Sequence, residues 1–403
     1  MRTPSYFLLE KIKNLVKRAL LRGSFRSWLI SHRARQIDEA YVRTISDEAL
    51  SPSPAIATAT APGPTNLKHG SRLSRILYIG ICMWEQDQLF PEIRKICQLD
   101  ALDLGPFLKD ATDHRAAVVS AIRNHASSPH LAEPDLILFY ARPSLLSEDA
   151  FSEIRRRWSC PLLGMNLDDR VEFFPYGILK SGNDDYARWC RSFDLNLTSS
   201  MTAVDWYRRR GAEVRYFPQG FRPDPRFLHP PERIDFEFNF SFVGSWKPER
   251  EHILEQLAAY GLQPALFGRG WPNGRWIDDP ATVFRASQIN LGIGYALASA
   301  QIANAKGRDI ECPGTGACYL TTYHWELAEM FDIGKEVLCY RNFEELVELH
   351  SFYSKRPEVC LKIARAAHKR AHSEHTWENR LRGLFANLGF ALNPLTTNPG
   401  KRE

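Results

Sequence analysis

The chain has 403 residues, of which 44% are hydrophobic and 25% are charged, as is typical of a soluble globular protein with two or three domains. This composition excludes a collagen-like, a wholly disordered and a polytopic membrane protein. Residues 1–50 contain ten Lys or Arg and five Asp or Glu, so this segment carries the whole net charge of +5. The remainder of the chain is neutral, which argues against nucleic acid as a partner.

Residues 4–22 are predicted to form a basic amphipathic helix. Pro4 suits the first position of a helix and Gly23 suits its end. The apolar stripe consists of Leu8, Ile12, Leu15 and Ala19, with Leu9, Val16 and Leu20 beside it. Lys and Arg side chains lie largely outside the stripe. Two interpretations remain open: the helix lies on an anionic membrane surface, or it packs on the protein's own body.

The helical extension is predicted to span residues 1–48, with a less regular part after residue 24. Residues 49–67 contain no charged and no aromatic side chain and four prolines. A segment of this composition cannot bury a core, so residues 49–70 are predicted to be a semi-extended Pro/Ala/Thr-rich linker.

From Arg75 onward, short apolar segments alternate with amphipathic helical ones. The predicted strands lie at 76–81, 135–140, 161–167, 195–198 and 214–217. The predicted helices lie at 88–98, 147–158 and 202–210. This alternation is typical of a parallel sheet covered by helices on both faces, so residues 71–225 are predicted to form a Rossmann-like domain.

A segment rich in Pro, Gly and Arg at 218–231 interrupts the alternation, which then restarts. Further strands are predicted at 238–243, 265–267, 289–293, 319–321 and 337–340, with a helix at 248–261. Residues 226–390 therefore form a second predicted Rossmann-like domain, followed by a disordered tail at 391–403. The fold class is α/β, with two Rossmann-like domains that face a cleft where α/β proteins bind ligands.

Several common motifs are missing. The turns after the first strand of each half, Gly80–Trp84 and Gly244–Pro248, lack the G-x-G-x-x-G pattern of nicotinamide-binding and methyl-donor-binding enzymes. No P-loop and no G-x-S-x-G nucleophile elbow occur. The eight cysteines include no Cys-x-x-Cys pair, which favours buried thiols in a reducing cytoplasm over a metal site.

The segment with the densest chemistry is 306–322, with the sequence KGRDIECPGTGACYLTT. Lys306 and Arg308 precede a short helical turn, and a pair of cations near backbone N–H groups suits a diphosphate. Glu311 supplies a carboxylate that suits two ribose hydroxyls. The alternative is a structural Arg–Glu pair at i, i+3 on one turn of a surface helix.

This segment resembles the CgeB-like family of glycosyltransferases, which is related to the group 1 glycosyltransferases with the GT-B fold. The resemblance extends through residue 348, the helix at 357–370 and the closing SEHTWENRL. Weaker matches are FSFVGSWKPERE (240–251), LFGRGWP (266–272), VRYFPQGFRPD (214–224) and PLLGMNLDD (161–169). In all it covers roughly residues 75–388 and leaves out the extension.

The resemblance implies that the second domain holds a nucleotide-sugar donor. It implies that Glu311 contacts the donor ribose and that Arg308 and Lys306 lie near the diphosphate. Further donor-binding candidates are Lys247, Arg250, Gly268, Arg269 and Gly314. For Lys247 and Arg250, the alternative is a pair of solvated side chains at a helix start.

In the first domain, Asp168 and Asp169 end a predicted strand, where one of them acts as a catalytic base or orients the acceptor. The alternative is a turn or a helix cap. Group 1 enzymes carry two glutamates separated by seven residues, and Ala303 stands where the first would be. This departure leaves the stereochemistry and the acid or base residue unassigned.

The predicted function is therefore transfer of a sugar, hexosyl or related, from a nucleotide-diphosphate sugar to an unknown acceptor, with a role in envelope glycoconjugate synthesis. No Asp-x-Asp motif is present, so neither a metal nor another cofactor is expected. The expected location is the cytoplasm, with residues 4–22 on the inner face of the membrane. The alternatives are a non-catalytic, membrane-tethered scaffold or sensor that binds sugar nucleotides, and an epimerase on the same fold.

Overall fold

The computed structural model describes parts of 32–42 and residues 71–127, 132–174, 185–232, 236–296, 299–303 and 305–392. The predicted helix at 4–22, the linker at 49–70 and residues 393–403 of the predicted tail lie outside them. The body divides into two compact units. Residues 71–222 and 374–392 belong to the first unit, and Pro223–Ser373 form the second.

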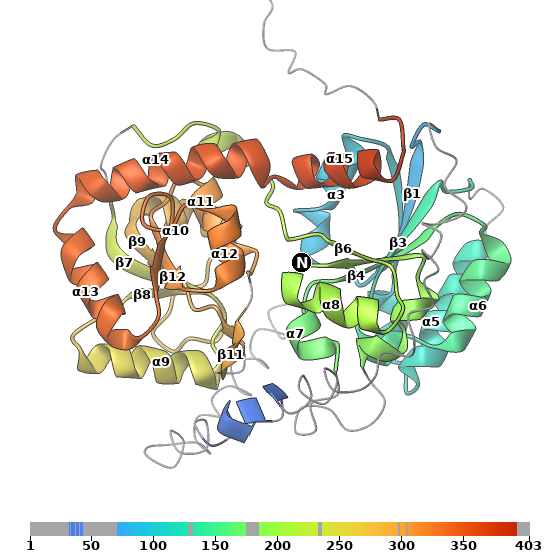
Figure 1. Ribbon diagram of the computed structural model, residues 1–403, viewed down its shortest axis with the longest axis horizontal. Coiled ribbons are helices and arrows are strands. Elements are labelled where there is room, and N and C mark those ends of the chain that lie inside the picture. Colours follow the sequence, from blue (N-terminus) through green and yellow to red (C-terminus); the bar gives the residue numbers. More distant parts are fainter. Residues whose placement is uncertain are drawn as a thin grey trace, which may run out of the picture. The chain divides into compact units, whose positions relative to one another are not determined.

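A six-stranded parallel sheet lies at the centre of the first unit, as far as the structure describes it, with helices along it (Figure 1). Its strands are β1 (Arg75–Gly80), β2 (Gln98–Asp103), β3 (Leu136–Tyr140), β4 (Leu162–Asn166), β5 (Leu195–Thr198) and β6 (Val214–Tyr216). They are ordered β2-β1-β3-β4-β5-β6, and every neighbouring pair is parallel. The connecting helices include α3 (Phe90–Arg94), α4 (Gly105–Leu108), α5 (His114–Ala126), α6 (Glu148–Arg157), α7 (Asp169–Glu172) and α8 (Met201–Arg209).

Successive side chains of a strand point to opposite faces of the sheet, and helices and loops bury both faces of this one. On β3, Leu136 and Leu138 join one core cluster, while the ring of Phe139 lies 6.2 Å from that of Phe151 on α6. This two-sided burial explains why β1, β3 and β4 appear in the sequence as nearly continuous apolar segments.

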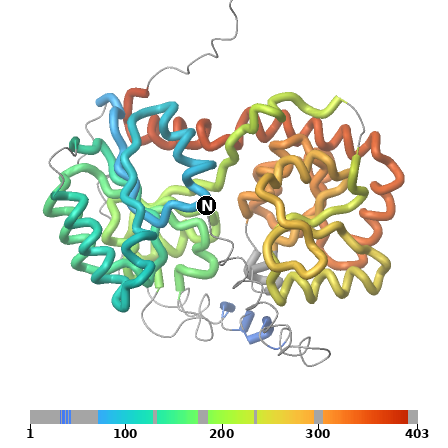
Figure 2. Tube along the Cα trace, turned by 180° about the vertical axis from the view of Figure 1, so that it is seen from behind, coloured from blue at the N-terminus to red at the C-terminus, as the bar shows by residue number. Residues whose placement is uncertain are grey.

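The predicted domain division assigned residues 226–390 to the second half. The C-terminal helix α15 (Trp377–Asn387) instead belongs to the first unit. Its apolar side chains Trp377, Leu381, Leu384 and Phe385 join the core cluster of the first unit with side chains of β1 and α3. Figure 2 shows this helix beside the blue and cyan segments of that unit. The chain also pairs there beyond α15, because the Ala391 N–H donates to the Ser71 carbonyl oxygen at 2.9 Å.

The second unit contains a five-stranded parallel sheet in its described part. Its strands are β7 (Phe238–Val243), β8 (Ala265–Phe267), β9 (Ser287–Leu291), β12 (Tyr319–Thr322) and β13 (Leu338–Tyr340), ordered β13-β12-β9-β7-β8. Its helices include α9 (Pro248–Ala259), α10 (Pro280–Ala286), α11 (Arg308–Gly314), α12 (Trp325–Met330), α13 (Phe343–Ser354) and α14 (Pro357–Glu374). A separate antiparallel pair is formed by β10 (Tyr295–Ala296) and β11 (Ser299–Ala303).

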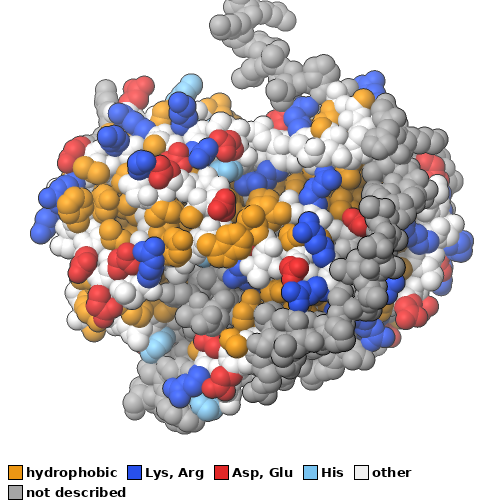
Figure 3. Space-filling model, in the orientation of Figure 1, with side chains coloured by type: hydrophobic (Ala, Val, Ile, Leu, Met, Phe, Trp, Pro, Cys, Tyr) orange, Lys and Arg blue, Asp and Glu red, His pale blue; other side chains and the backbone are white. Residues whose placement is uncertain are grey.

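The predicted α/β class with two Rossmann-like domains is confirmed. Three predicted strands, at 195–198, 238–243 and 265–267, have the same bounds as β5, β7 and β8. Among the described residues, no helix is long and apolar enough to cross a membrane. Charges of both signs are interspersed over the face of the second unit seen at the left of Figure 3.

Candidate functional site

Several of the predicted donor residues lie at the carboxyl edge of the second sheet. Gly244 directly follows β7, Gly268 directly follows β8, and α11 begins at Arg308. Since all strands of this sheet are parallel, the segments that follow them meet at one edge, where α/β proteins bind ligands.

Two arginines from different helices flank Gly244. A Cβ atom added to Gly244 would lie 3.0 Å from Nη1 of Arg308 and 3.1 Å from Nη1 of Arg250. Arg308 donates to the Val243 carbonyl oxygen at 2.5 Å, and Arg250 donates to that of Ser245 at 2.8 Å. Both guanidinium groups also lie over the ring of Phe242, at 5.2 Å and 5.8 Å from its centroid. These contacts place both guanidinium groups close to the backbone at Gly244.

The part of the chain that the structure describes holds these two arginines through backbone contacts. In the described part of the chain, neither forms a salt bridge with a carboxylate; their hydrogen bonds go to backbone oxygens. Burial and the nearby positive charge of Arg308 lower the pKa of Arg250 to about 10. Two like charges held together are unfavourable without an anion, so this arrangement is suited to binding one.

Glu311 lies one helical turn after Arg308. Burial raises the pKa of its carboxyl group, and the positive charge of Arg308 opposes that increase. Its side chain is only partly exposed, and no hydrogen bond to its carboxylate is found within the described residues. A half-buried carboxylate near the Arg308 guanidinium is available to accept hydrogen bonds from ligand hydroxyls.

Gly268 supports the turn that carries Gly244. Its φ is +121°, and a Cβ atom there would lie 2.5 Å from the Gly244 carbonyl oxygen. The two turns are also joined by hydrogen bonds from Trp246 N–H to the Arg269 oxygen at 2.6 Å and from Trp271 Nε1 to the Gly244 oxygen at 2.7 Å. Only glycine permits this close approach at position 268. The Arg269 guanidinium lies over the ring of Trp276, at 4.6 Å from its centroid.

The other donor candidates occupy different environments. Lys306 precedes α11, and its backbone N–H donates to Asp309 Oδ2 at 2.7 Å. Lys247 is exposed at the start of α9. Gly314 is buried in α11, and its carbonyl oxygen accepts a hydrogen bond from His372 Nε2 at 2.9 Å. Gly314 is therefore a packing position in this structure.

The two aspartates of the first unit are separated by burial. Asp169 is fully buried, and its carboxylate accepts hydrogen bonds from the hydroxyls of Thr198 and Tyr207. Burial raises the pKa of its carboxyl group to about 8. Asp168 is exposed at the end of β4, and its backbone N–H donates to Asn166 Oδ1 at 2.9 Å. Asp169 thus stabilises this edge of the sheet, and Asp168 is the member of the pair that solvent reaches.

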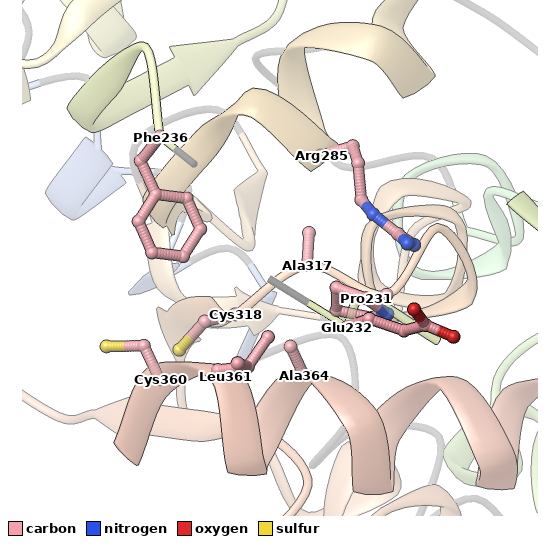
Figure 4. A pocket seen from close by; sticks show the side chains of 10 residues that line it. Pro231, Glu232, Phe236, Arg285, Ala317, Cys318, Cys360, Leu361 and Ala364 are labelled. Carbon is pink, nitrogen blue, oxygen red and sulfur yellow. The ribbon is translucent and has the colours of Figure 1, made fainter. Parts of the chain in front are cut away.

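A cavity of about 290 Å³ in the second unit lies away from these residues. Its lining includes Phe236, Arg285 and Cys318, which precede β7, β9 and β12, so the cavity is at the amino edge of the sheet. Figure 4 shows Cys360, Leu361 and Ala364 of α14 along one side of it. The Arg285 guanidinium is hydrogen-bonded to the carbonyl oxygens of Thr315 and His229.

Sequence reasoning missed two parts of the site. One is Gly244, where the two arginines converge; its only signal was a glycine directly after an apolar strand. The other is Asp309, a buried side chain between Arg308 and Glu311. The described residues include no cluster of three or more His, Cys, Asp or Glu able to hold a metal ion.

Residues 249–386 match a family model described as glycosyl transferase-like, which covers less than half of the chain. A comparison with curated proteins found no match. Anabaena Alr3699/HepE, solved in complex with UDP and glucose, is 12% identical with a TM-score of 0.55, covering 78% of this chain and 99% of that chain. The sucrose-phosphate synthase of Thermosynechococcus elongatus is also 12% identical with a TM-score of 0.55, covering 78% of this chain and 100% of that chain. At this identity the likeness establishes the fold, which is the GT-B fold.

Proposed function

We propose that the protein is a glycosyltransferase that moves a sugar, hexosyl or related, from a nucleoside diphosphate sugar to an acceptor. The observation that carries the proposal is the pair of cations, Arg250 and Arg308, that meet beside Gly244, with Glu311 one helical turn from Arg308. A diphosphate bound there would neutralise both guanidinium groups, and Glu311 would accept hydrogen bonds from the ribose.

The match of residues 249–386 to a glycosyl transferase-like family supports this proposal. A neighbour of the same fold, HepE, has also been solved with UDP-glucose. The CgeB-like group is the subfamily that we propose, on the motif KGRDIECPGTGA. We identify the donor class as a nucleoside diphosphate sugar without naming its base.

We propose that the leaving nucleoside diphosphate is stabilised by fixed cations. As the bond to the sugar breaks, negative charge develops on the diphosphate oxygens, and cations that are already positioned stabilise it without reorganisation. Arg250 and Arg308 would supply that charge, so the proposed reaction requires no metal ion and no further cofactor. Lys247 and Lys306 are additional cations for the same group.

The first unit is the proposed acceptor domain. Asp168, exposed at the carboxyl end of β4, is the carboxylate proposed to orient the acceptor or to remove its proton. Ala303 in place of a glutamate leaves the stereochemistry open. It also favours a second candidate function, a non-catalytic module that binds sugar nucleotides on the same fold.

A thermal-shift panel with UDP, GDP, ADP, dTDP and CMP tests the proposed donor site. A ligand that binds only the native state adds about 2.7 kcal/mol at ~100 times its dissociation constant. We expect one nucleoside diphosphate to raise the melting temperature. If none does so up to millimolar concentration, the proposed function is wrong.

Turnover then separates the two candidate functions. With the sugar nucleotide of the selected base, an enzyme releases the nucleoside diphosphate slowly by hydrolysis and faster with an acceptor. Binding without any release would favour the non-catalytic module, and turnover to a new sugar nucleotide without acceptor would indicate an epimerase.

We also propose that residues 4–22 hold the protein on the cytoplasmic face of an anionic membrane, where the acceptor is an envelope glycoconjugate. The support is the predicted apolar stripe of Leu8, Ile12 and Leu15, with Lys and Arg side chains largely outside it. Each Lys or Arg near an anionic surface contributes about 1 kcal/mol to binding. The full chain is expected to float with anionic vesicles and to dissociate as salt rises. A variant that lacks residues 1–68 is expected to stay soluble. Full-length protein that remains at the bottom of the gradient at low salt would refute membrane binding.

A further inference from the structure

The helix that carries Arg308 and Glu311 needs contacts from outside itself. α11 has only seven residues and contains Pro313, and its N-cap residue Gly307 provides no side-chain acceptor. A helix this short is marginal in water, and a glycine cap leaves its first N–H groups without a side-chain partner. The position of Arg308 and Glu311 therefore depends on whatever fixes the first turn of α11.

Asp309 makes those contacts. Its side chain is 2% exposed, and its Oδ2 accepts a hydrogen bond from the Lys306 N–H at 2.7 Å. Its Oδ1 accepts one from the Tyr319 hydroxyl at 2.7 Å, with the Thr321 hydroxyl at 3.5 Å. The His324 Nε2 lies 3.9 Å from Oδ2. One carboxylate thus joins the segment before α11, α11 itself and β12.

The charge of this carboxylate is retained in the fold. Burial tends to raise the pKa of Asp309, but His324 and the hydrogen bonds from Lys306 N–H and Tyr319 outweigh it, so the pKa is lowered. A buried carboxylate is costly unless it is hydrogen-bonded, and Asp309 has these partners on both oxygens. It is therefore a strong tether, because loss of one partner leaves a buried charge unsatisfied.

We propose that Asp309 is a positioning residue that fixes the first turn of α11 against β12 and thereby directs Arg308 toward Val243 and Gly244. The donor role of Arg308 and Glu311 rests on the proposed function above; the positioning of α11 does not. Asp309 itself faces Tyr319 and Thr321 in the protein interior, so it acts through its neighbours on α11.

The first test measures backbone hydrogen exchange of residues 305–315 in the full chain without ligand. Asp309→Asn keeps the shape but removes the negative charge and replaces one acceptor oxygen with an NH2 group, so the two hydrogen bonds to a charged acceptor are lost. We expect faster exchange in this segment and unchanged exchange in α9. The matched control is Gln288→Met, which removes buried hydrogen bonds to the Tyr353 and Ser354 oxygens at the other edge of the sheet. Unchanged exchange at 305–315 in the Asn variant would overturn the proposal.

The second test measures the affinities of UDP and uridine by calorimetry. Asp309→Asn is expected to weaken UDP about tenfold, which corresponds to about 1.4 kcal/mol, and to cost much less in a background that already carries Arg308→Ala. Gln288→Met is expected to leave both affinities unchanged. An equal loss in both backgrounds would mean that Asp309 does not act through Arg308.

These measurements separate the two claims. Faster exchange at 305–315 in Asp309→Asn, with no binding of UDP, GDP, ADP or dTDP by the unmodified protein, would sustain the positioning of α11 and count against the proposed function. Tyr319→Phe removes one donor only and provides a milder variant, with a smaller effect of the same kind, if Asp309→Asn fails to fold. A Tyr319→Phe variant with unchanged exchange at 305–315 would also contradict the proposal.

Discussion

Replacement of Arg308 with Ala is expected to weaken the binding of a nucleoside diphosphate about 10- to 150-fold. This corresponds to the roughly 1.5–3 kcal/mol of a hydrogen bond to a charged group. The affinity for the bare nucleoside is expected to change much less, because the contact is to phosphate. Calorimetry with UDP and uridine measures both. Lys in place of Arg308 is expected to restore part of the affinity, because it keeps the charge but loses the planar fork of donors.

The matched control is Arg365→Ala. Arg365 is in the same unit and donates to the Pro231 carbonyl oxygen at 2.7 Å, much as Arg308 donates to that of Val243. Its loss is expected to leave both affinities unchanged. Equal weakening of UDP and uridine in Arg308→Ala would place this guanidinium in a structural role.

A second large effect is expected for Glu311→Gln. The change keeps the shape but replaces a charged acceptor with an amide, so nucleoside diphosphate affinity is expected to fall by about 1.5–3 kcal/mol. The melting temperature without ligand is expected to change little, since no hydrogen bond of the described fold ends on this carboxylate. Glu358→Gln, an exposed carboxylate in the first turn of α14, is the control.

The effect of Glu311→Gln is also expected to depend on pH. Burial raises the pKa of Glu311, so its carboxylate is protonated at higher pH than an ordinary glutamate. As the pH falls, the charged acceptor is lost and the affinities of the two proteins should converge. If the Gln variant binds UDP as tightly as the unmodified protein at neutral pH, Glu311 does not contact the ribose.

The central strands, such as β3, β4 and β9, were predictable because they are buried on both faces. The continuous apolar segment LILFY of β3 and the repeated Phe residues of FNFSFV in β7 both predict a strand. β2 was missed because it lies at the edge of its sheet, where its residues are mostly half-buried and mixed in polarity. The pair β10 and β11 was missed as well, since its strands are short and antiparallel within a pattern of parallel ones.

The unit to which α15 belongs could not be predicted from the order of elements along the chain. Its stripe of Trp377, Leu381 and Leu384 predicts an apolar helix face but not which sheet receives it. In the site, the spacing of Arg308 and Glu311 was visible in the sequence. Their relation to Arg250 was not, because it depends on how β7 and α11 meet at Gly244. The roles of Asp168 and Asp169 likewise depend on burial, which the adjacent positions do not reveal.

The most direct test of the central claim is an experimental structure of the full chain with UDP. We expect the diphosphate within hydrogen-bond distance of the Arg308 and Arg250 guanidinium groups beside Gly244, with the ribose hydroxyls on Glu311. Nucleotide bound elsewhere, for example in the cavity lined by Phe236 and Cys318, would contradict the assignment of this edge of the sheet as the donor site.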